Sequence, residues 1–149
     1  MKIFNRKYSR EYEKVEEYEA GIALTGAEVK SVKSGNIKID DAYVRIFNNE
    51  AYLVNANIPP YKFAKKDEYY DGSKRRRLLL HKRELIRIMT KMKSHGLTII
   101  PIVCYNKHGL IKLTIALSKG KRDAEKRKYE KVKDMKMREK QEAKEYLKR

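Results

Sequence analysis

The densest run of charge in the chain lies directly before its most apolar triplet, in the segment YDGSKRRRLLLHKR at residues 70–83. Clustered lysines and arginines are the side chains that bind the phosphate groups of a polyanion. Leucines favour burial, whereas burying a cation without a counter-charge costs on the order of several kcal/mol. The run therefore either keeps a loop soluble or holds a polyanion against a rigid body. We expect Leu78, Leu79 and Leu80 to anchor a short strand that leads into a helix. The cations expected on the surface before it are Lys74, Arg75, Arg76 and Arg77.

Two further basic clusters accompany this run, and tyrosines are frequent. One cluster lies at the N-terminus, and the other is the tail after Gly120. A single charge run is usually a solvated face, but three clusters favour polyanion binding. The eleven tyrosines offer surfaces on which RNA bases can stack, although most of them are typical strand residues. The pattern predicts a polyanion-binding protein of moderate specificity. The N-terminal cluster contains Lys2, Arg6, Lys7 and Arg10.

The overall charge points to the same class of partner. The chain has 149 residues, with 37 Lys+Arg against 20 Asp+Glu, which gives a net charge of +17. A charge of that size repels itself in the folded state, so an external anion is expected to balance it. Nucleic acid is the first candidate and an anionic membrane the second. No segment approaches the roughly 18 apolar residues of a spanning helix, so we expect nucleic acid and no membrane.

Residues that could support catalysis are scattered. His81, His95 and His108 lie far apart in the sequence, and Cys104 is the single cysteine. A zinc site of the Cys-x-x-Cys type is therefore impossible, and no phosphate-loop, dinucleotide-binding or nucleophile-elbow motif is present. Adjacent Asp40-Asp41 would point apart in a strand or turn and is typical of a solvated turn. We expect a non-enzymatic protein without metal or cofactor.

The compartment follows from the cysteine count and from the N-terminus. One cysteine excludes an intramolecular disulfide, as is typical of a reducing cytosol. The start MKIFNRKYSR is basic, but acidic residues follow from Glu11 onward and there is no apolar segment of a signal peptide. A cytoplasmic location is expected.

Glu28 has two open interpretations. Thr25 followed three residues later by Glu28 is the spacing of a helix capping box. An acidic side chain on a basic RNA-binding face could also accept hydrogen bonds from base donors or from a ribose 2′-hydroxyl. The sequence leaves both roles possible.

The elements that must position these residues are mostly short. An alternating strand is expected within residues 12–24, and a short helix runs from the Thr25 cap to Gly35. Residues 42–47 and 51–58 form a hairpin across Asn48-Asn49. A second helix over residues 81–96 has apolar residues at i, i+3, i+4 and i+7. Residues 97–105 and 110–117 form a second hairpin, with one apolar face made of Ile111, Leu113, Ile115 and Leu117.

This order predicts a mainly β fold. Several short strands with two or three inserted helices favour a small OB-like β-barrel, and we assign it to residues 1–120. Residues 121–149 form a basic C-terminal tail with 13 basic and 7 acidic residues. Its apolar residues do not form one stripe, so a helix there is not stable alone. We expect the tail to be disordered when free and helical on a partner.

Four segments carry a family resemblance. Asn5-Arg6-Lys7 precedes the first strand, YEAGIALTGAEVKSVKSG spans residues 18–35, KRRRLLLHKREL spans 74–85, and GLTIIPIVCYNKHGLIKLTIALSKGKR spans 96–122. In these the chain resembles the SsrA-binding protein (SmpB) family, the bacterial partners of transfer-messenger RNA. Gly72-Ser73 is a departure, because the family often has proline after the aspartate at position 71.

The resemblance implies a function. It implies an OB-like barrel that binds the tRNA-like domain of transfer-messenger RNA in place of the missing anticodon stem. It also implies delivery of that RNA to stalled 70S ribosomes, with the tail in the empty mRNA channel near the decoding centre. Alanyl-tRNA synthetase and elongation factor Tu are then indirect partners, and the free protein is expected to be a monomer.

The candidate site residues combine the clusters with the resemblance, in which the family's RNA contacts fall on Asn5 and Glu28. The RNA-binding candidates are Asn5, Arg6, Lys7, Glu28, Lys30, Lys74, Arg75, Arg76, Arg77, His81, Lys82, Lys119, Gly120, Lys121 and Arg122. The ribosome-binding candidates in the tail are Lys126, Arg127, Lys128, Lys131, Lys133, Lys136 and Arg138. A generic basic OB-fold RNA-binding or ribosome-associated protein is the alternative, and it differs in that its function should survive removal of the tail. A nucleic-acid enzyme is a third possibility, which the missing carboxylate or histidine cluster disfavours.

Overall fold

One antiparallel sheet organises the chain, and four helices surround it. The computed structural model describes residues 1–148. Within them the strands are β1 (Lys2–Phe4), β2 (Tyr12–Ile22), β3 (Tyr43–Phe47), β4 (Glu50–Val54), β5 (Arg76–Leu79), β6 (Thr98–Lys107) and β7 (Leu110–Gly120). The helices are α1 (Tyr8–Glu11), α2 (Gly26–Lys33), α3 (Lys82–His95) and α4 (Asp123–Leu147). The prediction of a mainly β, OB-like fold with inserted helices is confirmed.

The sheet closes on itself. Its strand order is β1-β6-β3-β4-β5-β2-β7, and β7 also pairs with β6. Six strands therefore form a ring, with β1 attached outside it along β6. Long pairings of β7 with β2 and β6 build one side of the ring. The pairings of β3 with β6 and of β2 with β5 are short. The first consists of the single residue pair Val44 and Ile99.

The core fills the inside of this ring. The alternating face predicted for the last strand points inward, since Leu113, Ile115 and Leu117 are fully buried and Ile111 is nearly so. Alternation of side chains across a strand explains why Lys112 and Thr114 between them are only half-buried. Buried side chains from the helices complete the core, including Val32 of α2 and Ile88 of α3.

Turn residues set the ends of several elements. Asn48 and Asn49 both have positive φ, 47° and 59°, as the tight hairpin turn between β3 and β4 requires. Gly96 ends α3 in the left-handed conformation, with φ of 59°. The predicted strand over residues 51–58 is wrong in its second half. Asn55 has φ of 64°, which interrupts the extended backbone after Val54.

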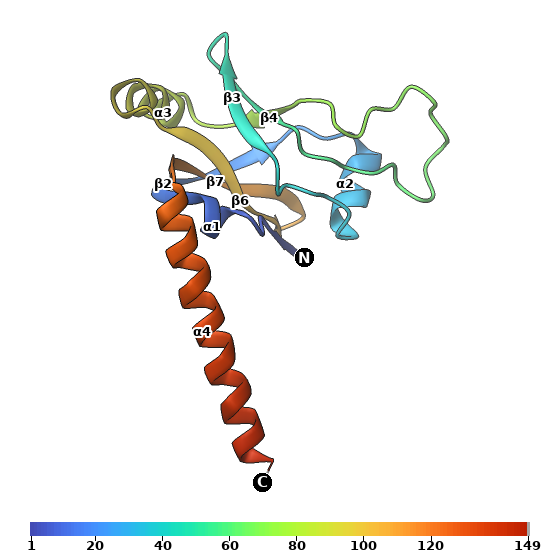
Figure 1. The fold of residues 1–149 in the computed structure, drawn as a ribbon. Helices are drawn as coiled ribbons and strands as arrows, with labels where there is room; N and C mark the ends of the chain where they lie inside the picture. Colours follow the sequence, from blue (N-terminus) through green and yellow to red (C-terminus); the bar gives the residue numbers. More distant parts are fainter. Residues whose placement is uncertain (149) are drawn as a thin grey trace.

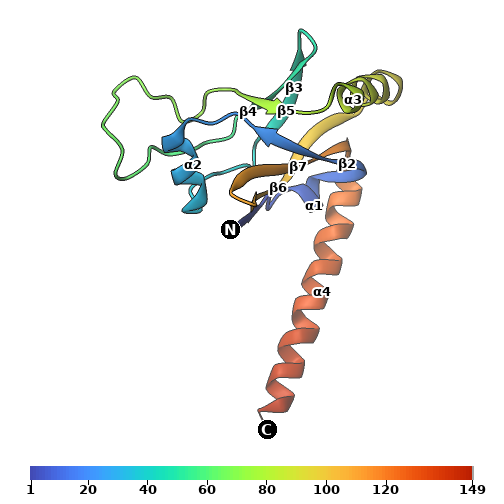
Figure 2. The ribbon, with the colours of Figure 1, turned by 180° about the vertical axis from the view of Figure 1, so that it is seen from behind.

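The helices lie on different sides of the ring. Figures 1 and 2 show α3 and α2 at opposite sides, with the long β4–β5 connection beyond α2. α4 projects away from the sheet, and none of its described residues is buried (Figure 1). The expected disorder of the free tail stays a prediction, as does the division at residue 120, and residue 149 lies outside the described part of the chain. β1 and α1 were not predicted.

Candidate nucleic-acid interface

A buried ion pair joins α2 to β5. Thr25 caps α2, since its hydroxyl accepts from the Glu28 N–H at 3.2 Å and its own N–H donates to Glu28 Oε1 at 3.0 Å. The other carboxylate oxygen, Oε2, accepts from Arg76 Nε at 2.8 Å and lies 2.7 Å from Arg76 Nη2. Both side chains are almost completely buried. This buried pair therefore ties the first turn of α2 to the strand that follows the basic run.

Arg76 has further partners around the pair. Its Nη1 donates to the carbonyl of Lys74 at 3.0 Å and to that of Ala56 at 3.3 Å. Its Nη2 lies 3.3 Å from the hydroxyl of Tyr70, which itself donates to the Ile58 carbonyl at 2.8 Å. The guanidinium thus fixes both ends of the β4–β5 connection.

The expectation that all four cations of the run lie on the surface is wrong for Arg76. Side chains alternate along β5, so Arg76 and Leu78 point inward while Arg77 and Leu79 point outward. Burial of Arg76 is tolerated because the Glu28 carboxylate compensates its charge. The same alternation leaves Leu79 52% exposed, so only part of the leucine triplet anchors the strand.

The capping role of Glu28 is confirmed. Burial opposes its charge, but the Thr25 N–H and the Arg76 guanidinium outweigh burial, and they hold the pKa of Glu28 below its ordinary value. Each carboxylate oxygen already accepts from a protein donor. Its direct contact with RNA stays a prediction.

Exposed cations beside aromatic rings cover the surface around this buried pair. The Arg75 guanidinium lies 4.6 Å from the ring centre of Tyr52, and Lys74 Nζ lies 5.7 Å from that of Tyr70. Lys30 of α2 approaches Tyr61 at 5.8 Å. We call this surface the cation–aromatic face, and its residues are Lys30, Tyr52, Tyr61, Lys62, Phe63, Tyr69, Tyr70, Lys74 and Arg75.

From the sequence the tyrosines were expected to offer stacking surfaces collectively, but no individual ring of this face was singled out. Phe63 is 76% and Tyr69 92% exposed, and Phe63 lies edge-on to Tyr61 with 5.6 Å between the ring centres. Base-stacking surfaces with adjacent cations are what single-stranded RNA binders present. The signal that could have found them is the interleaving of aromatic and basic residues in YKFAKKDEYYDGSK, at residues 61–74.

The N-terminal candidates form a separate group. Asn5 is buried, and its amide donates to the Pro101 carbonyl at 2.9 Å while its Oδ1 accepts from the Lys7 N–H at 3.1 Å. Lys7 Nζ forms an ion pair with Asp41 at 2.6 Å, and this partner raises the pKa of Lys7. The Arg6 N–H donates to Asp40 at 2.8 Å, and the Arg6 side chain is exposed. Asn5 therefore positions the chain before α1, and Arg6 presents its charge to solvent.

The exit from the sheet joins the body to α4. The Lys121 N–H donates to the Glu11 carbonyl at 2.8 Å, and its Nζ donates to the Ser9 carbonyl at 2.6 Å and lies 4.6 Å from the Tyr129 ring. Arg10 also pairs with Glu130 of α4. Lys121 thus has a structural role in addition to any RNA contact. Lys119, Gly120 and Arg122 are exposed, as are all the tail candidates except the half-buried Lys126.

His81 and Lys82 lie apart from the cation–aromatic face. They are exposed at the start of α3, on the side of the ring opposite to α2 (Figure 1). The His81 N–H donates to the Glu84 carboxylate at 3.3 Å, which caps the helix.

Other chemistry has little support in the described residues. Within residues 1–148, no three His, Cys, Asp or Glu side chains are grouped as a metal site. Burial raises the pKa of Cys104 to about 12, so this thiol stays protonated and is a poor nucleophile. None of the described helices combines the length and the apolar character needed to cross a membrane.

A closed antiparallel sheet with exposed cation–aromatic pairs and a projecting basic helix is the architecture of a nucleic-acid-binding protein. Comparison with known proteins gives the family. The sequence model described as SmpB protein matches residues 2–145. This chain belongs to the SmpB protein family, in agreement with the resemblance seen in the sequence and with the expectation of a non-enzymatic RNA-binding protein.

Individual relatives cover nearly the whole chain. The SsrA-binding protein of Persephonella marina is 48% identical, over 89% of this chain and 86% of the relative. That of Thermosipho africanus is 44% identical, over 100% of this chain and 99% of the relative. A solved chain described as "tmRNA-SmpB: a journey to the center of the bacterial ribosome" has a TM-score of 0.67 at 38% identity, and the match covers 82% of this chain and 85% of that one.

Proposed function

We propose that this chain binds the tRNA-like domain of transfer-messenger RNA and delivers it to stalled ribosomes for trans-translation. Family membership supports the proposal, because the relatives carry the name SsrA-binding protein and the solved neighbour is described with tmRNA in the bacterial ribosome. The chain acts by binding, in the cytoplasm and as a monomer. Alanyl-tRNA synthetase and elongation factor Tu are indirect partners through the RNA.

The cation–aromatic face carries the proposal. Its cations can contact phosphates, and its exposed rings can stack on unpaired bases of an RNA loop. The buried Glu28–Arg76 pair holds α2 and the β4–β5 connection together beneath that face. A face fixed in this way does not need to be ordered on binding, which favours recognition of one RNA shape over another.

The tail performs a second step. Residues 121–149 carry a net charge of +6, and the described cations of α4 are exposed except for the half-buried Lys126. A helix of this kind suits a channel lined by phosphates. In the proposal it enters the empty mRNA channel near the decoding centre of a stalled 70S ribosome, where no mRNA competes for the same charge.

The test compares two RNAs and two forms of the protein. Binding of full-length protein, and of a chain ending at Gly120, is measured to the tRNA-like domain and to an ordinary tRNA across a salt series. Both proteins are expected to prefer the tRNA-like domain at least about ten-fold. Only full-length protein is expected to support trans-translation on stalled ribosomes in a reconstituted system.

A matched pair of variants locates the binding. Lys30→Ala/Arg75→Ala is expected to weaken binding to the tRNA-like domain and to reduce the salt slope by about 2, one for each phosphate that the protein no longer neutralises. Lys93→Ala/Lys112→Ala removes the same charge near α3 and should change affinity much less. If neither protein form prefers the tRNA-like domain, and affinity merely follows salt, the chain is a generic basic RNA binder instead.

A further inference from the structure

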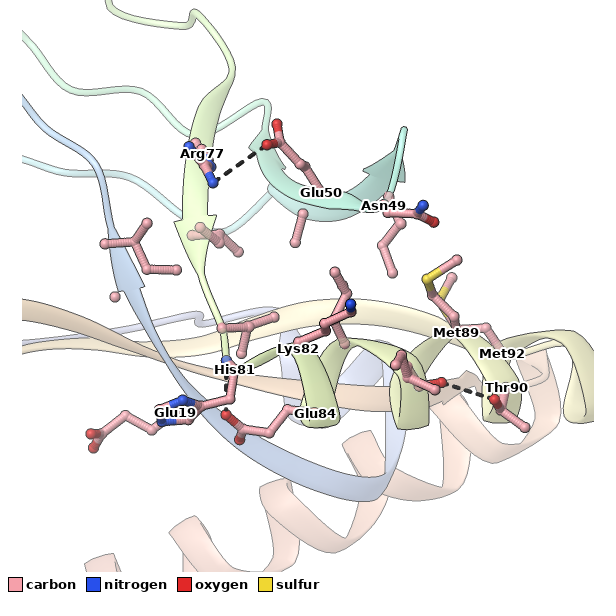
Figure 3. Close-up of a pocket in the computed structure, with 18 of the residues that line it drawn as sticks. Glu19, Asn49, Glu50, Arg77, His81, Lys82, Glu84, Met89, Thr90 and Met92 are labelled. Atoms are coloured by element: carbon pink, nitrogen blue, oxygen red, sulfur yellow. Dashed lines mark hydrogen bonds and ion pairs between the residues drawn. The ribbon is translucent and has the colours of Figure 1, made fainter.

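A hollow lies between α3 and the β3–β5 side of the ring, and its lining includes no residue of the cation–aromatic face. Its volume is about 1110 Å³. In Figure 3, Met89 and Met92 of α3 point toward Asn49 at the β3–β4 turn, with the hollow between them. α3 is held to β2 through Glu16, which pairs with Lys91 and lies 3.1 Å from Arg87. We call this hollow the α3 groove.

About half of the residues that line the α3 groove are apolar. They include Leu79, Leu80, Leu85, Ile86 and Met89. Leu79 is 52% and Ile86 55% exposed. Leu79 lies on the outer face of β5, a strand inside the ring, where a polar side chain would also fit. Large apolar side chains gathered in a concavity mark an interaction site more often than scattered surface residues do.

At the rim of the groove, the lysines lack ion-pair partners among the described residues, whereas the acidic side chains have partners. Within residues 1–148, the cations Lys82, Lys93 and Lys112 have no ion-pair partner. The acidic side chains of the lining are already paired. Glu50 pairs with Arg77 at 3.4 Å, Glu19 with Lys107 at 3.2 Å, and Glu84 caps α3. The rim therefore offers free positive charge around an apolar floor.

We propose that the α3 groove docks an amphipathic segment of a partner protein, with apolar residues on one side and acidic residues beside them. The apolar side would cover the leucines and methionines, and the acids would meet the free lysines. RNA fits less well, because no phenylalanine, tyrosine or tryptophan of the described residues lines the groove to stack on bases. A second copy is disfavoured by the repulsion of two chains that each carry +17.

The test uses a synthetic probe on full-length protein. The probe is an acidic helical peptide with leucines at i, i+3, i+4 and i+7, and its control has serines at those positions and the same charge. Methyl NMR of labelled Leu, Ile and Met reports the site, and fluorescence anisotropy reports the affinity. We expect the leucine probe to shift the methyl signals of Leu79, Ile86 and Met89 and to bind at least ten-fold more tightly than the serine peptide.

Variants separate the groove from general surface effects. Leu79→Ser/Ile86→Ser changes two exposed floor residues and is expected to weaken probe binding at least ten-fold. Phe4→Ser/Val15→Ser changes two equally exposed apolar residues outside the groove and should leave binding unchanged. An unshifted Leu113 methyl signal verifies that the core is intact in each variant.

Four results would overturn the proposal. The first is that the serine peptide binds as tightly as the leucine probe, and the second is that Leu79→Ser/Ile86→Ser binds the probe as tightly as wild type. The third is that the tRNA-like RNA, and not the probe, shifts the methyl signals of the groove. The fourth is that these signals shift with protein concentration alone. The third result would assign the groove to RNA, and the fourth to a second copy. Binding of the tRNA-like domain is measured on the same variants, so failure of this proposal leaves the RNA-binding proposal standing.

Discussion

Arg76 and Arg75 are neighbours of the same type with opposite environments. Arg76 is buried on Glu28, whereas Arg75 lies on the surface over the Tyr52 ring. Removing one partner of a buried ion pair leaves the other charge uncompensated, which costs about 3–5 kcal/mol. We therefore expect Arg76→Met to lower the free energy of unfolding by about that amount, measured by urea denaturation.

The matched variant Arg75→Met should behave in the opposite way. An exposed substitution changes stability by less than about 0.5 kcal/mol, but removing a cation that neutralises a phosphate should weaken RNA binding and reduce the salt slope by about 1. The double variant Glu28→Gln/Arg76→Met leaves neither charge buried, so it should be more stable than Arg76→Met alone. Equal stability of Arg75→Met and Arg76→Met would falsify the structural role of the pair.

The same carboxylate makes stability depend on pH. The pKa of Glu28 in the folded protein is below its ordinary value of 4.5, because the Thr25 N–H and the Arg76 guanidinium outweigh burial. A lowered pKa contributes stability that is present above 4.5 and is lost as the pH falls through the folded value. We expect the stability difference between wild type and Glu28→Gln to narrow on acidification from neutral pH to about pH 3, measured by urea denaturation. Parallel curves would assign the acid sensitivity to other carboxylates.

Local spacing reveals only some of these residue roles. The capping box was predictable, because Thr25 and Glu28 are three residues apart. The partner of Glu28 was not, because Arg76 lies 48 residues further along the chain. Nothing in four consecutive cations indicates which one points inward until the register of β5 is known.

At the scale of elements, Gly72 sets the path of the β4–β5 connection. Its carbonyl accepts from the Ile58 N–H at 2.9 Å, and a Cβ at this position would lie 2.7 Å from Asn57 Oδ1 and 2.8 Å from the Ile58 carbonyl oxygen. The Ile58 carbonyl oxygen cannot move away without disturbing the hydrogen bond between the Ile58 N–H and the Gly72 carbonyl. We expect Gly72→Ala to destabilise the protein by about 1–3 kcal/mol, as overpacking does, and to weaken RNA binding by displacing the aromatic rings of the connection.

Gly26→Ala is the matched control for this prediction. A Cβ at Gly26 meets nothing within 4 Å, and alanine favours a helix, so stability should be unchanged or slightly higher. Thermal denaturation and binding of the tRNA-like domain are measured on both variants. A Gly72→Ala protein with normal stability and affinity would mean that the connection accommodates the methyl group without moving.

Elements whose apolar residues recur at a regular spacing were predictable, and elements without such a pattern were not. α3 carries a helical apolar pattern, and β7 alternates from Ile111 to Leu117, whereas β6 was recognisable as a continuous apolar run before a turn. β1 and α1 have three and four residues, too few to show any period. The β4–β5 connection has none, so its position against Asn57 and Ile58 depends on contacts that only the folded ring creates.

At the scale of the whole molecule, the apolar core and many of the basic side chains occupy different parts of the structure. The apolar side chains fill the ring, and a large share of the basic ones lie on α4, which buries none of its described residues. The first turns of α4 contact the body, through Glu130 with Arg10 and Tyr129 with Lys121. The body therefore sets the direction in which the tail leaves, but it contributes little to the stability of the distal part of the helix.

This separation predicts how the tail responds to a partner. Helical stability in proteins comes mostly from tertiary packing, which the distal part of α4 lacks, and like charges four residues apart, such as Lys136 and Lys140, destabilise it further. We expect Cα chemical shifts of the free protein to show reduced helicity after about Lys133, with Tyr129 and Glu130 more helical. Adding a short RNA should increase helicity beyond Lys133, because phosphates neutralise the repulsion. Tyr129→Ala/Glu130→Ala should lower helicity at the base of the tail, whereas Tyr146→Ala should not. Full helicity through Leu147 in the free protein, unchanged by RNA, would mean that the tail is a preformed rod rather than a segment that folds on its partner.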